Sequence, residues 1–217
     1  MRPALNPALL AIPLLAALHA DIIDRIVASV DNLVITRSDI ERQIRVTALQ
    51  EGVKPDLSAR HKRATLETLI DQKLIQRDLG NSRYPLPNPA ELNPAIEQFK
   101  RDHFPSEAEY RRVLAEYCIT EQDFRDLLLW QRTLLSFIEV RFESGVQLTG
   151  QEVSDYFEKT VKPAAEAAHP GQAVTLDDYR SQIEKKLQAD RGDRELDSWL
   201  KSARRRARII VHKEALQ

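Results

Sequence analysis

The segments that favour β-strand lie at the two ends of the sequence, and this placement limits how the chain can fold. Residues 22–30 (IIDRIVASV) and 33–36 (LVIT) are rich in β-branched side chains. Asp31 and Asn32 between them can adopt the positive backbone angles of a tight hairpin turn. The other convincing strand is residues 207–212 (ARIIVH). Because a hairpin alone is marginally stable in water, we predict that the late strand pairs with it and that both ends belong to one domain.

Almost everything between these strands is predicted to be helical. The 217 residues include only 6 Gly and have long runs of Leu, Glu, Arg, Gln and Ala, which favour helix. A hydroxyl residue followed three positions later by an acid, the capping-box arrangement, marks helix starts at Ser38–Glu41, Ser106–Glu109, Thr120–Asp123 and Thr149–Glu152. With apolar residues at helical spacing, these signals predict helices over residues 39–50, 59–79, 89–102, 107–117, 121–141, 150–161 and 176–204. The expected fold class is mainly α, a multi-helix domain with a small antiparallel sheet made by the N-terminal hairpin and the C-terminal strand.

The first twenty residues have the pattern of a secretory signal peptide. Arg2 precedes the apolar run 9–18 (LLAIPLLAAL), and the small residue Ala20 stands before the acidic Asp21. The run is too short for a membrane-spanning helix, which needs about 20 apolar residues. An N-terminal core helix is the alternative, because Leu18 is a poor residue three positions before such a cleavage site. We expect an exported protein, periplasmic in a Gram-negative source, with no stable membrane insertion.

Several functional classes are disfavoured by composition and spacing. The scattered glycines form neither a dinucleotide-binding fingerprint nor a phosphate-binding loop. The net charge of -1 argues against a dedicated nucleic-acid binder. The basic cluster of Arg204, Arg205, Arg206 and Arg208 is interpreted as a solvated helix end, where cations complement the exposed carbonyls. We therefore expect no nucleic-acid partner.

The residues that could carry catalysis are isolated from one another. The five histidines are far apart in sequence, and Cys118 is the single cysteine, so we expect no metal site and no cofactor. No nucleophile motif surrounds Cys118, and the pair Asp177 and Asp178 falls in a predicted first helical turn, where acids are favoured by the dipole. We assign no catalytic residue.

The order of these segments resembles the chaperone module of SurA-type periplasmic chaperones and their foldase relatives. The segments that carry the resemblance are IVASVDNLVITRSDIERQI, LETLIDQKLIQRDLG, EYRRVLAEYCITEQDFRDLLLWQRTLLSFIEVRF, VQLTGQEVSDYFEK and IEKKLQADRGDRELDSWLKSARRRARIIV. With the signal peptide placed at 1–20 by its own pattern, the resemblance implies one chaperone domain at 21–217. Within that domain it implies a helical body at 38–161, a short linker at 162–174, and a closing helix and strand at 175–213. In that family a parvulin-type prolyl isomerase domain is usually inserted at the linker, and the interval 159–175 is too short to hold one.

The resemblance implies a holdase that works without ATP and without isomerase activity. Its partners would be unfolded exported polypeptides, including outer-membrane β-barrel precursors. A helical scaffold protein that docks one dedicated partner is the alternative, and promiscuity, which separates the two, cannot be read from sequence. A prolyl isomerase with an unrecognised site is a third hypothesis, disfavoured by the short interval. The sequence does not indicate an oligomeric state.

A candidate client-binding surface, an open groove rather than a sealed core, is predicted between the short helices that follow the proline-rich segment 84–94. Its apolar contacts are predicted to be Phe99, Phe104, Tyr110, Leu114 and Tyr117. The charged side chains of Arg101, Arg111 and Arg112 would form a solvated border around this surface. Burial of the same aromatic residues in an ordinary core is the competing interpretation.

Overall fold

The computed structural model describes residues 24–80, 84–143, 147–169 and 173–216. It is 75% helical with one three-stranded antiparallel sheet, so the expected fold class is confirmed. The predicted signal peptide at 1–20 lies outside the described residues. In chain order the elements are β1 (Ile26–Val30), β2 (Leu33–Thr36), α1 (Arg37–Glu51), α2 (Ala59–Gly80), η1 (Pro89–Leu92), α3 (Asn93–His103), α4 (Glu107–Glu116), α5 (Glu121–Ile138), η2 (Glu139–Glu143), α6 (Gly150–Tyr156), η3 (Phe157–Val161), α7 (Lys162–Ala168), α8 (Leu176–Arg206), β3 (Ile209–Val211) and η4 (Lys213–Leu216).

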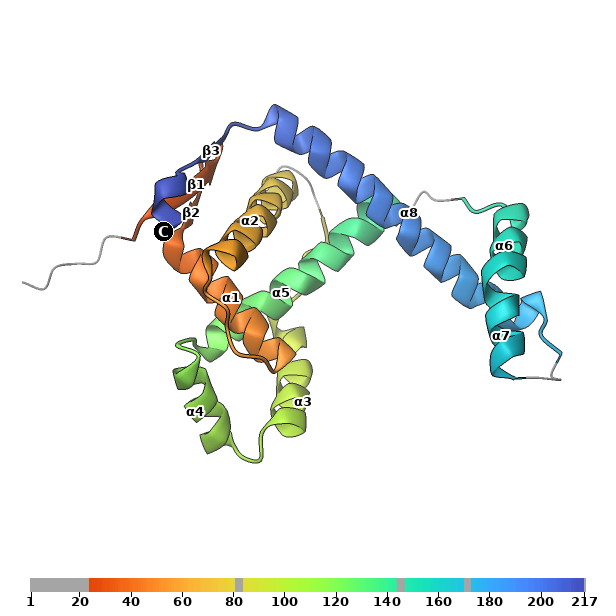
Figure 1. Ribbon diagram of the computed structural model, residues 1–217, viewed down its shortest axis with the longest axis horizontal. Coiled ribbons are helices and arrows are strands. Elements are labelled where there is room, and N and C mark those ends of the chain that lie inside the picture. Colours follow the sequence, from red (N-terminus) through yellow and green to blue (C-terminus); the bar gives the residue numbers. More distant parts are fainter. Residues whose placement is uncertain (1–23, 81–83, 144–146, 170–172, 217) are drawn as a thin grey trace, which may run out of the picture.

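The molecule has a body and an arm (Figure 1). The body contains the sheet, α1 to α5 and the C-terminal half of α8, and the arm contains α6, η3, α7 and the N-terminal half of α8. The long helix α8 runs from one to the other, so it is the main connection between them. Of the helices in the part of the chain that the structure describes, none has the length and apolar content of a membrane-spanning segment.

The sheet joins the two ends of the described chain. Its strand order is β2-β1-β3, with Val30 opposite Leu33 on one side and Ile209 on the other. At the hairpin turn Asp31 has a φ of 53°, and its carboxylate accepts a hydrogen bond of 2.9 Å from the backbone N–H of Arg208. The prediction that the late strand pairs with the hairpin is therefore confirmed.

The sheet packs against α1, α2 and the end of α8 to form the first part of the body core. Arg204 of α8 extends this contact to α2, where its guanidinium lies 2.7 Å from carboxylate oxygens of both Asp71 and Glu67. Arg204 is therefore half-buried in an ion-pair network. The interpretation of the whole basic cluster as a solvated helix end is wrong at this position, although Arg205 and Arg206 are exposed.

The second part of the core lies between α1, α3, α4 and α5. Its buried side chains are Val46, Leu49, Leu92, Ile96, Tyr110, Leu114, Ile119, Phe124 and Leu127. N-terminal caps fix the starts of two of these helices. Thr120 and Asp123 form a capping box at α5, and the Ser106 side chain caps α4 by accepting a hydrogen bond from the N–H of Glu109. Both starts agree with the sequence prediction.

The helix α1 begins two residues before its predicted start. Its capping box is formed by Thr36 and Asp39 rather than by Ser38 and Glu41. Ser38 instead donates its backbone N–H to the Asp24 carboxylate, which holds the residues before β1 against the helix start. Thr36 with Asp39 and Ser38 with Glu41 both have the hydroxyl–acid spacing of a capping box, so the local pattern fits either start. The contact of Ser38 with Asp24 decides between them.

A π-helical turn, η2, ends α5 where α8 crosses it. Gly192 of α8 is buried at this crossing, and a Cβ atom added there would lie 2.9 Å from Cγ of Glu143 in η2. The two helices approach so closely because Gly192 has no side chain. We call this crossing the joint between body and arm.

The arm replaces the predicted linker. Residues 162–168 of the expected loop 162–174 form α7, which contacts η3, and η3 and α6 pack against α8. Pro163 did not prevent this helix, because it directly follows the π-helical turn η3, so the break in α-helical hydrogen bonding that a proline causes falls where the helix already departs from α geometry. The alanines that follow it are strong helix formers. Residues 162–168 are therefore part of a folded unit.

Candidate functional site

The five predicted client-contact residues lie in the second part of the body core. Tyr110 and Leu114 are buried, and Phe99, Phe104 and Tyr117 are half-buried and pack against them. The ring of Phe104 lies 5.2 Å from that of Tyr110, and the ring of Phe99 lies 5.8 Å from that of Phe104. The open groove expected between the short helices is therefore wrong, because these side chains fill the space between the helices themselves.

Lys100 covers this aromatic cluster from the solvent side. Its ammonium nitrogen lies 4.8 Å from the centre of the Tyr110 ring and 2.8 Å from a carboxylate oxygen of Glu121. Burial raises the pKa of the Tyr110 hydroxyl to about 12, since the charged phenolate would be desolvated. Among the described residues, this hydroxyl has no hydrogen-bond partner.

The predicted polar rim does reach solvent. Arg111 and Arg112 are exposed and form ion pairs within α4, the first with Glu107 at 3.1 Å and the second with Glu109 at 2.7 Å. Arg101 is exposed on α3. These cations surround a closed core and do not border an apolar opening. Client contact by the five residues stays a prediction, and their burial does not favour it.

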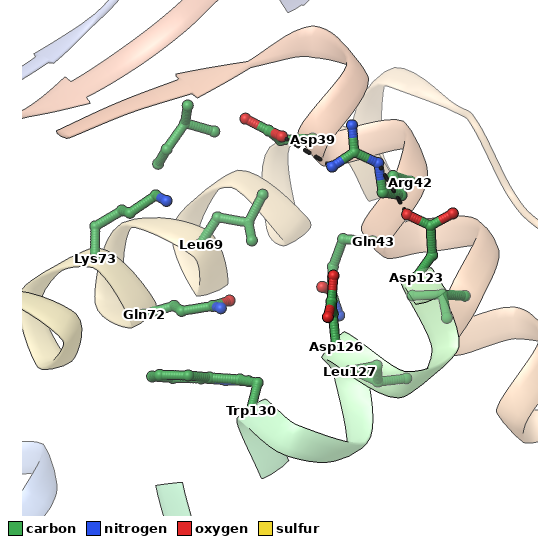
Figure 2. A pocket seen from close by; sticks show the side chains of 12 residues that line it. Asp39, Arg42, Gln43, Leu69, Gln72, Lys73, Asp123, Asp126, Leu127 and Trp130 are labelled. Carbon is green, nitrogen blue, oxygen red and sulfur yellow. Dashed lines mark hydrogen bonds and ion pairs between the residues drawn. The ribbon is translucent and has the colours of Figure 1, made fainter. Parts of the chain in front are cut away.

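A charged cavity of about 150 Å³ opens in the body between α1, α2 and α5 (Figure 2). Arg42 of α1 lies between two carboxylates, 3.4 Å from Asp39 and 3.4 Å from Asp123. The same two acids form the capping boxes of α1 and α5. The charged groups of this cavity therefore hold the starts of two helices together.

The rest of the cavity wall does not suit a ligand. Lys73, Asp126 and the indole of Trp130 border the space (Figure 2), above a floor of buried aliphatic side chains from Ile35, Val46, Leu69 and Leu127. Small-molecule pockets usually exceed about 300 Å³, twice the volume of this one. Its fixed charges are largely used within the protein, so we interpret the cavity as a polar junction of the body.

The largest apolar groove that we identify on the described surface lies on the arm, between η3 and α7 on one side and the start of α8 on the other. We call it the arm groove, and its volume is about 490 Å³. Its apolar wall is formed by Tyr156, Val161, Ala164, Ala165, Ala168, Tyr179 and Ile183. Its polar border is formed by Thr160, His169, Gln182 and Lys186. The lining contains alanines and two tyrosine rings, so the groove is shallow and apolar. Such a groove can accept apolar side chains of different shapes.

The charges at the arm groove leave its floor neutral. None of the residues lining it is acidic. Lys186, the one lysine of the lining, is bound to Asp190 one turn later on α8, and this hydrogen bond raises the pKa of the Lys186 ammonium. Apolar segments can therefore enter without desolvating an unpaired carboxylate.

Few buried residues hold the arm together. Its described core consists of Val153, Phe157 and Ile183, with other apolar side chains packed around them only in part. An ion pair of 2.6 Å between Arg191 of α8 and Glu152 of α6 adds to this packing. A small core gives a low free energy of local opening, so the groove walls can adjust to what they bind.

The sequence prediction missed this site because it treated residues 162–174 as a linker. The signal that could have found it is the alanine run after Pro163, which suits a helix, together with Tyr156 and Val161 on the preceding turns. The groove itself depends on how η3, α7 and α8 are arranged around it, which no local pattern specifies.

Comparisons with known proteins do not assign a function to these surfaces. A scan of the sequence against models of known protein families finds no match, and a search of curated proteins finds no significant relative. Within the described ranges, no three His, Cys, Asp or Glu side chains gather where they could hold a metal ion. The arm groove has to be interpreted from its own residues.

Proposed function

We propose that this protein is an ATP-independent holdase that binds unfolded exported polypeptides and keeps them from aggregating. The observation that carries the proposal is the arm groove, an apolar channel of about 490 Å³ on a thin arm that projects from the body (Figure 1). Extended chain segments bind such surfaces through many weak apolar contacts, without selecting one sequence. The order of sequence segments, which resembles the SurA-type chaperone module, supports the same function.

The proposal places the protein in the periplasm and gives it no isomerase activity. Its clients would include outer-membrane β-barrel precursors. The body would act as the rigid support, because its core is closed and its aromatic residues are packed against one another. The arm would make the contact, and the mixed charges of the surrounding surface would keep the complex in solution.

The test is suppression of aggregation measured with several unrelated unfolded proteins. Ala164→Trp places an indole in the arm groove, and Ala167→Trp places the same indole on an exposed position of α7 that does not line it. We expect the wild type and Ala167→Trp to suppress aggregation broadly, and Ala164→Trp to lose most of this activity. Circular dichroism should show equal helix content in all three proteins.

Two outcomes would contradict the proposal. If the wild type suppressed aggregation of none of the clients, a scaffold that docks one dedicated partner would explain the surface better. If all three proteins suppressed aggregation equally, the arm groove would not be the contact surface. A photo-reactive side chain introduced at Thr160, on the border of the groove, provides a second check of this outcome. If the arm groove is not the contact surface, this side chain should cross-link no client.

A further inference from the structure

The most exposed large apolar side chains of the described chain lie together on the body, away from the arm groove. Leu86, in the connector between α2 and η1, is 66% exposed, and Leu135 of α5 is 64% exposed. Both border a groove of about 530 Å³ between the connector and α5, together with Pro85 and Pro87. We call Leu86, Leu135 and the two prolines the Leu135 patch.

The connector is attached to α5 at this patch. The hydroxyl of Ser136 donates a hydrogen bond of 3.3 Å to the backbone carbonyl of Pro85. The prolines further restrict the backbone of the connector. The patch is therefore a formed surface that a partner can meet without first ordering it.

Two charges of opposite sign flank Leu135 along the continuous helix formed by α5 and the start of η2. Arg132 precedes it by three residues and Glu139 follows it by four, and both are exposed and line the same groove. Neither side chain forms an ion pair with another residue in the described ranges. Residues seven apart lie about 10.5 Å apart along a helix, on nearly the same side. The face therefore presents a cation, an apolar residue and an anion in a line.

This line is complementary to its own reverse. Its midpoint falls between Leu135 and Ser136, so a two-fold axis through that point would place Arg132 opposite Glu139 of the partner subunit. The same rotation would place Leu135 against the partner's Leu135 and the groove beside it. A self-complementary patch of this kind is what a closed dimer with two-fold symmetry requires.

We propose that two copies of this chain associate through the Leu135 patch, with α5 antiparallel to α5 of the partner subunit. Glu91 also lines the groove and adds an acidic side chain to its border. The patch is small compared with interfaces of stable dimers, which bury about 1,200 Å² or more in total. The dimer should therefore form in the micromolar range.

Sedimentation velocity over roughly 1 to 200 μM protein tests the association, because this range brackets a micromolar dissociation constant. We expect the wild type to pass from monomer to dimer and Leu135→Ser to stay monomeric throughout. Val53→Ser is the matched control, since Val53 is 50% exposed outside the patch. Helix content and melting temperature should be unchanged in both variants.

Charge reversal tests the predicted pairing. Arg132→Glu alone places two acids against each other, and Glu139→Arg alone places two bases against each other, so each variant should lose the dimer at least tenfold in affinity. A 1:1 mixture of the two variants restores both opposite-charge contacts and should form a heterodimer. A wild type that stays monomeric at every concentration would overturn the proposal, and so would a dimer that Leu135→Ser does not weaken or a mixture that fails to associate. These outcomes do not depend on whether the protein is a holdase.

Discussion

The aromatic ring of Phe137 in α5 meets the indole of Trp199 in α8 edge to face, with the ring centres 5.4 Å apart. Arg141 lies over both rings, and its guanidinium also forms an ion pair of 2.8 Å with Asp78 at the end of α2. This contact and the buried Gly192 lie where α8 crosses the end of α5. The joint therefore connects three helices, and the position of the arm depends on it.

Truncation of Phe137 should destabilise the whole molecule. Phe137 is fully buried, and Phe→Ala changes in cores cost about 3–5 kcal/mol of unfolding free energy. We expect Phe137→Ala to lose a free energy in this range, measured by denaturant unfolding. Leu135→Ala on the exposed side of the same helix is the control and should change stability by less than about 0.5 kcal/mol. Equal losses of unfolding free energy in the two variants would show that the buried ring of Phe137 contributes no more to stability than an exposed side chain of the same helix.

Removal of residues 208–217 should lower the melting temperature of the helical body. The deletion removes β3, the hydrogen bond from Arg208 to Asp31, and the buried side chains of Ala215 and Leu216. Without β3 one edge of β1 loses its partner. Ile210→Thr, a change at an exposed β3 position, should leave the melting temperature within a few degrees. A truncated protein that melts like the intact one would contradict closure of the domain by its two ends.

Stability should fall in acid partly because of Glu41. A hydrogen bond of 2.8 Å from Lys62, with further help from Arg37, lowers the pKa of the Glu41 carboxyl below its usual 4.5. Because the folded pKa is the lower one, this stabilisation is present above about pH 4.5 and is lost as the pH falls through the folded value. Lys62 is itself buried.

The variant that tests this is Lys62→Met, which keeps the apolar stem. At pH 7 it should lose about 1.5–3 kcal/mol, the usual range for a hydrogen bond to a charged group. Unfolding measured from pH 7 to pH 3 should show the difference from the wild type shrinking below pH 4.5. A difference that stays constant over this range would mean that Glu41 does not contribute to the acid sensitivity.

Substitution can separate the contribution of the Tyr110 ring to stability from that of its hydroxyl. Its ring is fully buried, and its hydroxyl has no partner among the described residues. Tyr110→Phe should therefore be neutral or stabilising by up to about 1 kcal/mol, because an unsatisfied buried group is removed. Tyr110→Ser should destabilise by several kcal/mol, since it leaves a cavity of ring size. Denaturant unfolding distinguishes these results, and a clear loss in Tyr110→Phe would reveal a hydrogen bond made by this hydroxyl.

The chain should show no prolyl isomerase activity. The interval 159–175 contains the end of η3, α7 and the start of the following segment, which leaves no room for an isomerase core. A proline-peptide assay should give the rate of a buffer blank. Catalysis well above that rate, retained after contaminating isomerases are removed, would refute this prediction.

The sequence specified the parts of the fold that depend on local chemistry. Thr149 and Glu152 form the capping box that starts α6, as predicted, because a hydroxyl and an acid three residues apart satisfy the free N–H groups of the first turn. The turn at Asp31 was also predictable, since few residues tolerate a positive φ. These signals work over a few residues and need no partner from elsewhere in the chain.

The candidate site was not predictable in the same way. Phe124 and Leu135 are both apolar residues at helical spacing in α5, yet Phe124 packs into a core and Leu135 is exposed. Helical periodicity shows which side of a helix is apolar, and the neighbouring helix decides whether that side is covered. The arm groove is lined by Ala164 of α7 and Ile183 of α8, which are 19 positions apart in sequence and share one groove only in the folded chain.

Strand β3 has a consequence for how the protein is made. The bond between Arg208 and Asp31 joins groups that are 177 residues apart in sequence. On a ribosome the hairpin emerges first and waits, with one edge unpaired, while every helix between it and β3 is synthesised. Contacts of such long range form late, so the body sheet is completed only after those helices have been translated. Until then the first two strands keep an unpaired edge, which can associate with other nascent chains.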